Sequence, residues 1–410
     1  MTPAHGLPLP DTPGGSRASN RLSGWKLAVC LVGLFGLEIG FLQASGREEI
    51  SPSTATRSDR GYSYNHEEVA EIPWSIHVFK WARSHRELML STTLGASNHL
   101  GMSTVSEQLA RLDPELGLPI AAVNGDFYTN ESQAPGDPRD LQIYQGELIS
   151  APAGHACFWL DAAGQPRSTN VVSHLVCVLP DGTRHAMGLN EQRGADSVVL
   201  FTQRMGATTR TQGGIELVVD PVGLDAGRPL RPESIFSVQV RSIRRAGDTP
   251  IPAESWVLSI GPGLASRSAP VVEGAKIRLE TRTTPALSGV QMAIGGGPTL
   301  VRNGRVMDWS GILMRHPRTA IGWNKEFFFL VEVDGRQSQL SVGMTFPELA
   351  ACMLRLGCEE AMNLDGGGSA TLWVRGNVMN SPSEGRERPG ANSLVVLQPR
   401  VQPKSGSSNH

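Results

Sequence analysis

Short apolar runs separated by turn-forming residues recur along most of the chain. Hairpin signals stand at Asp181-Gly182, Asn303-Gly304 and Asp334-Gly335, and each lies between two apolar runs. These pairs favour tight turns because they accept the positive φ angles that hairpins require. The pattern therefore predicts a high content of β-strand, with many neighbouring strands paired antiparallel.

Two helices are predicted from the residues at their starts. Thr104 to Glu107 and Thr345 to Glu348 each have the form of a capping box, in which a hydroxyl and a carboxylate satisfy free backbone amides. The second helix ends near Gly357 and leads into an apolar run that ends at Asp365. Its apolar face is formed by Phe346, Leu349, Ala350 and Met353. We expect an α+β fold with a mainly antiparallel or mixed β-sheet core, a few packed helices, and the motif loops gathered at one rim.

Composition and charge narrow the range of functions. The chain has 410 residues, in which 37 Lys and Arg residues stand against 39 Asp and Glu residues. This balance gives no broad basic field, so nucleic acid is not expected as a partner. The 46 glycines indicate many turns and close backbone approaches, in agreement with a β-rich domain.

The N-terminal part of the chain predicts export. Residues 1–26 are rich in Pro, Gly and Ser and are expected to form a disordered tail. Residues 27–43 are almost wholly apolar and follow Arg21 and Lys26, which is typical of a signal peptide or a signal anchor. The run is shorter than the roughly 20 residues that span a bilayer and contains Glu38, which fits a signal peptide better, whereas the long preceding tail supports an uncleaved anchor, so both readings stay open. The remainder is expected to be periplasmic or extracellular, and held at the membrane if the segment is uncleaved.

The rest of the chain is expected to hold one large domain. Residues 44–71 predict a polar linker, 72–400 the domain, and 401–410 a disordered C-terminal tail. Cys157 and Cys177 sit on two apolar runs, which leaves open either a cross-strand disulfide or two buried free thiols. No Cys-x-x-Cys sequence occurs, so neither a zinc cluster nor a redox motif is indicated.

A carboxylate stands beside three glycines near the C-terminus. Asp365 ends a short apolar run that predicts a buried strand, and the following glycines permit a close ligand approach. A glycine-rich hairpin with Asp365 as a turn former explains the same residues. Motifs elsewhere favour the first reading, and they are Asn124-Gly125-Asp126-Phe127, Gly295 to Leu300, Arg318 to Gly322, Asp334-Gly335, and Arg388 followed by Asn392.

This ordered set of motifs resembles the phosphodiester glycosidase domain family over about Ile72 to Leu397. The animal representative of that family is the uncovering enzyme, which removes N-acetylglucosamine from a sugar-1-phosphodiester, and bacterial relatives are often called exopolysaccharide biosynthesis proteins. The resemblance implies an exported hydrolase that splits the bond between an anomeric carbon and a phosphodiester oxygen of a phosphorylated glycan. The alternative is a non-catalytic glycan-phosphate binding or polysaccharide assembly protein, and a phosphodiesterase that breaks the P–O bond is a third reading.

The resemblance also implies roles for single residues. Asp365 is expected near the anomeric carbon as nucleophile or base, with Asp126 as a partner carboxylate. Arg318 and Arg388 are expected to bind the phosphate and stabilise its charge as it leaves. The other candidates for substrate binding are Asn124, Thr319, Gly366, Gly367, Gly368, Ser369, Gly296, Gly297, Asn392 and Asp334.

The sequence leaves the metal requirement open. Asp365, Asp126 and Asn124 offer oxygen ligands of the type that Ca²⁺ or Mg²⁺ prefers. No zinc-binding pattern is present, so no transition metal is predicted.

Two further residues are ambiguous. His316 stands two residues before Arg318 and is either a proton donor beside a phosphate or a plain loop residue. Glu332 lies in an alternating strand pattern, which does not decide whether it faces the cleft or solvent.

Overall fold

The computed structural model describes residues 61–130, 133–223, 229–308 and 314–400. All of these belong to one unit, Pro52–His410. The expected N-terminal tail, export segment and C-terminal tail lie outside the described residues, and so does Cys30. Within the described ranges, no helix combines the length and the apolar character needed to cross a bilayer.

A seven-stranded antiparallel sheet carries several of the motifs. Its strands, in spatial order, are β1 (Tyr62–Val69), β2 (Trp74–Ala82), β21 (Phe327–Val333), β20 (Arg318–Trp323), β22 (Glu360–Asn363), β18 (Thr299–Arg302) and β19 (Arg305–Val306). The central strands β20 and β21 are buried at nearly every position. A strand covered on both faces is typically apolar along its length, and Glu332 is the one charged residue of β21.

A second sheet has eleven strands, all of them within residues 142–295. Its strands, in spatial order, are β11 (Arg184–Leu189), β12 (Val198–Phe201), β15 (Trp256–Ile260), β13 (Ile215–Pro221), β14 (Ile235–Arg244), β16 (Lys276–Thr284), β10 (Pro166–Val178), β9 (Ala153–Leu160), β17 (Met292–Gly295), β7 (Gln142–Tyr144) and β8 (Glu147–Ser150). Because β10 also pairs with β11, the strands from β11 to β10 close into a ring around their own apolar core. The pair β11 and β12 is parallel, and the other pairings of this sheet are antiparallel.

Smaller elements complete the domain. A five-stranded sheet has the order β24 (Asn377–Val378), β23 (Leu372–Val374), β4 (Leu118–Asn124), β25 (Ser393–Gln398) and β3 (Met89–Thr92), and β5 (Tyr128–Thr129) pairs with β6 (Asp137–Pro138). The helices are α1 (Val105–Ala110), α2 (Pro262–Ala265) and α3 (Phe346–Arg355), with 3₁₀ turns at Pro114–Leu116, Gln203–Met205 and Gly367–Ser369. The predicted antiparallel or mixed sheet core is confirmed, although helices contribute less than an α+β class implies.

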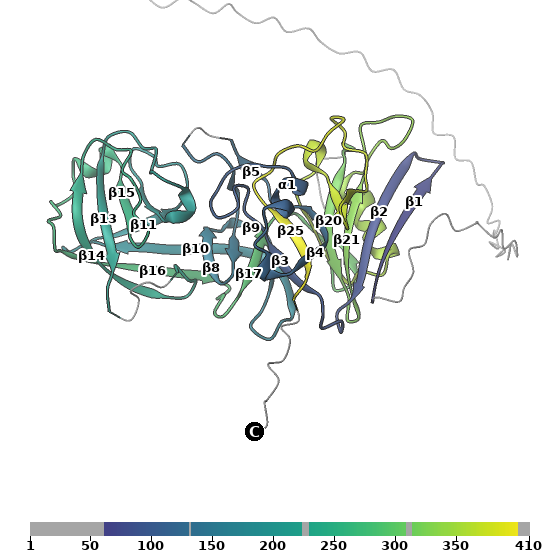
Figure 1. The fold of residues 1–410 in the computed structure, drawn as a ribbon, viewed down its shortest axis with the longest axis horizontal. Coiled ribbons are helices and arrows are strands. Elements are labelled where there is room, and N and C mark those ends of the chain that lie inside the picture. The colour runs from purple at the N-terminus through teal and green to yellow at the C-terminus, as the bar shows by residue number, and fades with distance from the viewer. Residues whose placement is uncertain (1–60, 131–132, 224–228, 309–313, 401–410) are drawn as a thin grey trace, which may run out of the picture. The chain divides into compact units, whose positions relative to one another are not determined.

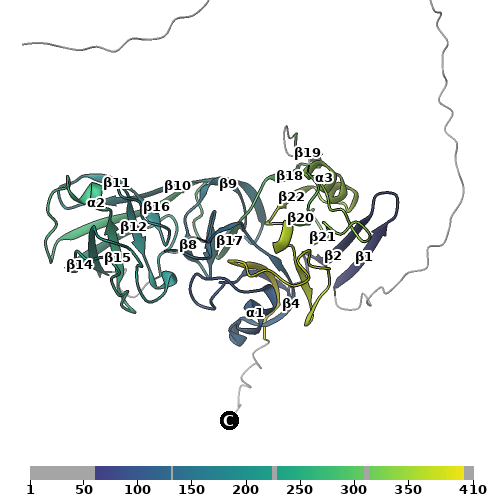
Figure 2. The same cartoon turned by 90° about the horizontal axis from the view of Figure 1, so that it is seen from above.

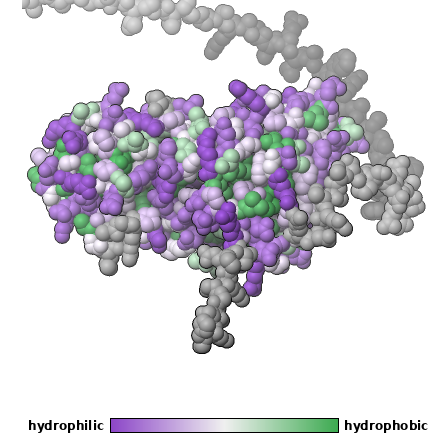
Figure 3. All heavy atoms as spheres, viewed as in Figure 1, coloured by the Kyte–Doolittle hydropathy of each residue, from purple (hydrophilic) through white to green (hydrophobic). Residues whose placement is uncertain are grey.

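The seven-stranded sheet is covered on both faces. On one face, Val331 and Ala320 pack against Leu349 and Met353 of α3, which lies over β18 and β22 in Figure 2. On the other face, side chains such as Leu330 pack against the five-stranded sheet. Figure 1 shows β3, β4 and β25 between the ring of β10 to β16 and the strands β1, β2, β20 and β21. Hydrophilic residues cover most of the face shown in Figure 3.

Local predictions hold where the signal is complete within a few residues. Both capping boxes are present, at Thr104 with Glu107 and at Thr345 with Glu348. The turns at 181–182 and 303–304 join β10 to β11 and β18 to β19 as hairpins.

The hairpin predicted at Asp334-Gly335 is wrong. β21 pairs with β2 and β20, and the chain after Asp334 leaves the sheet on its way to α3. The side chain of Asp334 is buried and accepts hydrogen bonds from Ser75 and from the backbone of Ser381, so tertiary contacts decide its conformation.

The linker expected at 44–71 includes part of the fold. β1 lies inside it and pairs with β2 over its full length, from Tyr62 opposite Trp81 to Val69 opposite Trp74.

The cysteines of the described residues are buried free thiols. Cys157 stands opposite Thr169 on β10, whereas Cys177 is eight positions farther along that strand. At about 3.3 Å per residue, the two cysteines are too far apart for a disulfide.

Candidate functional site

Loops from distant parts of the sequence line one cleft of about 840 Å³. It lies where the loop after β17, the start of β20, the loop after β22 and the loop before β25 meet. The predicted residues that line it are Gly296, Gly297, Arg318, Asp365, Gly366, Gly367 and Arg388. The expected gathering of motif loops is therefore present in the structure.

The cleft carries a strong excess of positive charge. Its lining includes the guanidinium groups of Arg139, Arg302, Arg318, Arg336 and Arg388. Asp365 supplies the single carboxylate among the lining residues. Such a surface favours an anionic ligand, because guanidinium groups offer paired donors to phosphate or carboxylate oxygens.

Arg318 is held rigidly at the start of β20. Its Nε donates to the Met344 carbonyl at 2.7 Å and its Nη2 to the Met314 carbonyl at 3.1 Å. The guanidinium also lies 4.1 Å from the centroid of the Phe346 ring. Burial, and then the charge of Arg336, lower the pKa of Arg318 to about 10, so the group is still charged at neutral pH. Its partners are neutral, and its charge stays available to a ligand.

The glycine run after Asp365 makes room for two arginines. Gly367 has a φ of +60°, and a Cβ there would lie 2.9 Å from Nη2 of Arg336. A Cβ on Gly368 would collide with the guanidinium of Arg388, which pairs with Glu384. Gly367 and Gly368 therefore allow the close approach of arginine side chains, while a Cβ on Gly366 would meet the Pro317 carbonyl at 2.6 Å.

Asp365 is fixed by backbone contacts on both sides. Its N–H donates to the Gly125 carbonyl at 2.9 Å, and its Oδ1 accepts from the Gly366 N–H at 2.9 Å. Burial raises the pKa of Asp365, while that N–H and the charges of Arg388 and Arg139 act in the opposite direction. The carboxyl thus binds its proton more tightly than an exposed aspartate does, which suits proton transfer.

Asn124 and Thr319 hold Asp365 in place through a chain of hydrogen bonds. Asn124, which is 4% exposed, donates from Nδ2 to the Asp365 carbonyl at 2.7 Å. Its Oδ1 accepts from the Thr319 hydroxyl at 2.7 Å and from the Thr371 N–H at 3.0 Å. The polar groups of both predicted residues form hydrogen bonds within the protein, and neither residue lines the cleft.

Asp126 and Asn392 also lie under the cleft. Asp126 donates its N–H to Oδ1 of Asn392 at 2.9 Å, and its Oδ2 accepts from the Asp140 N–H at 2.8 Å. Its Oδ1 has no hydrogen-bond partner among the described residues. Burial, and then the neighbouring Asp140, raise the pKa of Asp126 to about 8. A catalytic role for Asp126 stays a prediction, and this buried carboxyl does not line the cleft.

The other predicted residues lie behind the cleft wall. Gly368 and Ser369 are buried, and so is Asp334, which has 1% of its surface exposed. None of the three is among the lining residues.

A histidine that the sequence did not single out lines the cleft. Nδ1 of His155 lies 2.7 Å from Oδ2 of Asp140, and the His155 side chain is 52% exposed. Asp140 is fully buried and also accepts the Ala153 N–H at 2.9 Å. A carboxylate at one ring nitrogen fixes the orientation of the imidazole. No sequence motif joins these residues, because they meet only when β9 is in place.

Three arginines were missed for the same reason. Arg139 donates to the Gly296 carbonyl at 2.7 Å and lies 4.2 Å from the centroid of the Phe127 ring. Arg302 stands at the end of β18, and Arg336 follows the Asp334-Gly335 motif, which was its one signal in the sequence. His316 lines the cleft as well, and burial together with Arg318 and Arg336 lowers its pKa.

Comparison with known proteins supports the family resemblance. The model of the phosphodiester glycosidase family matches residues 260–397, so the predicted resemblance is confirmed for that segment. The chain is 35% identical over 99 residues to an uncharacterized protein derived from the SPbeta prophage of Bacillus subtilis (strain 168). That match covers 24% of this chain and only 15% of the relative.

Two solved structures share the fold. A hypothetical protein from Synechocystis superposes with a TM-score of 0.65 and 17% identity, over 85% of this chain and 64% of that one. A protein of Burkholderia pseudomallei whose name describes it as exported gives a TM-score of 0.62 and 25% identity, over 79% and 74% of the two chains. The fold is thus a recurring one.

Proposed function

We propose that this chain is an exported phosphodiester glycosidase, because residues 260–397 match the model of that family. It would hydrolyse a sugar-1-phosphodiester, such as an α-N-acetylglucosaminyl phosphodiester or a related envelope glycan, to the free sugar and a phosphomonoester. The observation that carries the proposal is a cleft with five arginines and one carboxylate, Asp365. That charge pattern fits a phosphate-bearing substrate.

The proposed reaction is a displacement at the anomeric carbon. A water molecule attacks this carbon, the bond from it to the phosphodiester oxygen breaks, and the phosphomonoester leaves with the bonding electrons. Asp365 takes the proton from the water. The leaving group is a weak base, so stabilising its negative charge matters more than protonating it. Arg318 and Arg336 are assigned that task, together with Arg388, whose guanidinium lies next to Gly368.

His155 is proposed as a second group for proton transfer. Its Nδ1 is held by Asp140, and the half-exposed ring lines the cleft. An imidazole oriented in this way can return a proton to the phosphate or hold a sugar hydroxyl. Asp126 would act indirectly, by holding the Asp140 backbone in place.

The direct test is release of free N-acetylglucosamine from UDP-N-acetylglucosamine or from a methyl-phospho analogue by the full chain. Asp365→Asn should reduce release by at least about 10²-fold, because the group that accepts the proton is lost. Asp181→Asn is the matched control, since Asp181 lies in an exposed hairpin turn. Equal release by the two variants would exclude Asp365 from the chemistry.

The alternative functions give different results in the same experiment. A non-catalytic binding protein would bind the sugar phosphate without releasing sugar. A phosphodiesterase would place ¹⁸O from labelled water in the phosphate, whereas a glycosidase places it in the sugar.

A further inference from the structure

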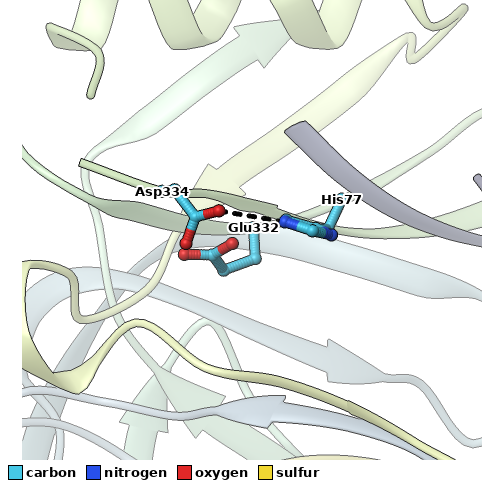
Figure 4. A group of neighbouring side chains, drawn as sticks. All are labelled: His77, Glu332 and Asp334. Atoms are coloured by element: carbon cyan, nitrogen blue, oxygen red, sulfur yellow. Dashed lines mark hydrogen bonds and ion pairs between the residues drawn. The ribbon is translucent and has the colours of Figure 1, made fainter. Parts of the chain in front are cut away.

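Three ionisable side chains lie together outside the cleft, on neighbouring strands of the seven-stranded sheet. His77 on β2 stands opposite Glu332 on β21, and Asp334 follows the end of β21 (Figure 4). One nitrogen or oxygen atom from each lies within 4.8 Å of the others. The exposed fractions are 3%, 0% and 1%, respectively. Two carboxylates in such a place require compensating positive charge, because a buried unpaired charge is costly.

Glu332 shows that this compensation is incomplete within the protein. Both of its carboxylate oxygens are buried and lack a partner of hydrogen-bond geometry among the described residues, although the nearby Asn380 side chain acts to lower the pKa of Glu332. Figure 4 shows its carboxylate beside that of Asp334. Buried polar atoms are almost always paired, so two orphaned oxygens beside a second carboxylate indicate a missing partner with positive charge.

The surrounding contacts orient the other two side chains toward the same point. The Tyr64 hydroxyl lies 2.8 Å from Nδ1 of His77, which leaves Nε2 for the cluster. The Ser381 N–H donates to Oδ1 of Asp334 at 2.7 Å, which leaves Oδ2 for the cluster. Nε2 and Oδ2 are 3.0 Å apart. Such outer contacts are typical of residues that bind metals.

We propose that His77, Glu332 and Asp334 form a buried structural site for a divalent transition-metal ion such as Zn²⁺. The ion would replace the proton between His77 Nε2 and Asp334 Oδ2 and would accept the orphaned oxygens of Glu332. One imidazole nitrogen with two carboxylates suits Zn²⁺, whereas Ca²⁺ and Mg²⁺ prefer oxygen ligands alone. The two carboxylates and the dication cancel in charge.

A fourth polar group stands next to this site. Oγ of Ser75 lies 2.7 Å from Oδ2 of Asp334 and 3.1 Å from Nε2 of His77. The ion would also fix the start of the segment that carries Arg336 into the cleft, two residues after Asp334. The site therefore supports the cleft wall without contacting a substrate there.

A proton on Glu332 is the competing way to neutralise the cluster. Without a cation, burial and then Asp334 raise the pKa of this carboxyl well above its usual range. Glu332→Gln resembles the protonated form and offers no anionic ligand, so it separates the two explanations. Glu359→Gln is the matched control, since Glu359 is exposed.

The experiment measures metal content and does not depend on enzymatic activity. The full chain is unfolded with chelator, refolded in Zn²⁺, freed of loose metal by gel filtration, and analysed by elemental mass spectrometry. We expect one Zn²⁺ per chain in the wild type and in Glu359→Gln, and retention reduced at least about tenfold in Glu332→Gln. Circular dichroism confirms that each chain has refolded.

Refolding of the wild type in Co²⁺ gives a second measurement that needs no variant. A bound Co²⁺ with one nitrogen and several oxygen ligands should give visible absorption bands that excess Zn²⁺ removes. Equal Zn²⁺ in wild type and Glu332→Gln would mean surface binding and would overturn the proposal. Absence of Zn²⁺ and Co²⁺ from the wild type would also overturn the proposal and would favour a proton on Glu332. Preference for Ca²⁺ or Mg²⁺ would overturn the assignment to a transition metal.

Discussion

Unpaired arginine side chains set the character of the cleft. Arg302, Arg318 and Arg336 form no ion pair with a carboxylate within the described ranges, whereas Arg139 and Arg388 each have one. Arg318 donates instead to backbone carbonyls, which orient the guanidinium without cancelling its charge. Arg318 is 6% exposed, so a phosphate that enters the cleft would meet at least this donor already in place and with little water to lose.

At the scale of one residue, Asp126 should make the stability of the fold depend on pH. Its pKa is raised by burial and by Asp140 from 3.8 to about 8. Because the folded value lies above the unfolded one, this contribution is complete below about pH 4 and is lost as the pH rises through about 8. Asp126→Asn has no such proton to lose. We expect it to flatten the fall in the free energy of unfolding between pH 5 and pH 9, as measured by urea unfolding.

Asp181→Asn provides the control for this pH profile. A hydrogen bond from the Thr183 hydroxyl lowers the pKa of Asp181, so its titration lies below this pH range. The control should keep the wild-type slope. If Asp126→Asn keeps it as well, Asp126 is ionised in the folded protein and the argument from burial fails.

At the scale of an element, α3 depends on the cap at its first turn. The Thr345 hydroxyl accepts from the Glu348 N–H at 3.3 Å, and Glu348 Oε2 accepts from the Thr345 N–H at 2.9 Å. The helix covers one face of the sheet and leads directly into β22, which ends two residues before Asp365. A loosened first turn therefore weakens the support of the site.

We expect Thr345→Ala to lower the free energy of unfolding by about 1 kcal/mol, because the first turn loses the acceptor for a backbone amide. Chemical denaturation measures the change. Thr345→Ser keeps the hydroxyl and should stay within about 0.5 kcal/mol of the wild type. A serine variant as unstable as the alanine variant would show that the methyl group matters, and the cap does not.

At the scale of the whole molecule, the three large sheets form separate and shared apolar cores around the cleft. The ring of β10 to β16 packs around an apolar core. The cleft is lined by residues of β9, β10, β18 and β20, by the first residue of α3, and by the loops that follow β4, β17, β21 and β22 or precede β25. Side chains of β2, β4, β9, β20, β21 and β25 meet in one further core, for example Phe79, Phe158, Leu330 and Leu394. Changes in this shared core reach the cleft through the strands that carry the motif loops.

A chain that begins at residue 72 should be less stable than one that begins at residue 61. The shorter chain lacks β1, so β2 becomes an exposed edge, and Tyr64 no longer contacts His77. Exposed edges promote aggregation. We expect a lower Tm in differential scanning calorimetry and earlier light scattering on heating. Equal Tm and equal scattering for the two chains would mean that β1 adds nothing to the fold.

The sequence by itself determined those features whose causes lie within a few residues. The turns at 181–182 and 303–304 and the capping boxes at Thr104 and Thr345 are complete local signals, because the atoms that bond are close in the chain. The Asp365 motif and its partners could be placed in one site from the ordered set of motifs. The family match at 260–397 covers the part that holds most of them.

Only the tertiary structure decided which side chains face the cleft and which lie behind it. Asn124 and Asp334 have the residue types of a binding site, but packing buries them, and their polar groups bond to the protein. His155 and Arg302 carry no motif and reach the cleft because β9 begins there and β18 ends there. These contacts join residues far apart in the sequence, so they depend on strand order and on how the sheets pack, and no local pattern contains that information.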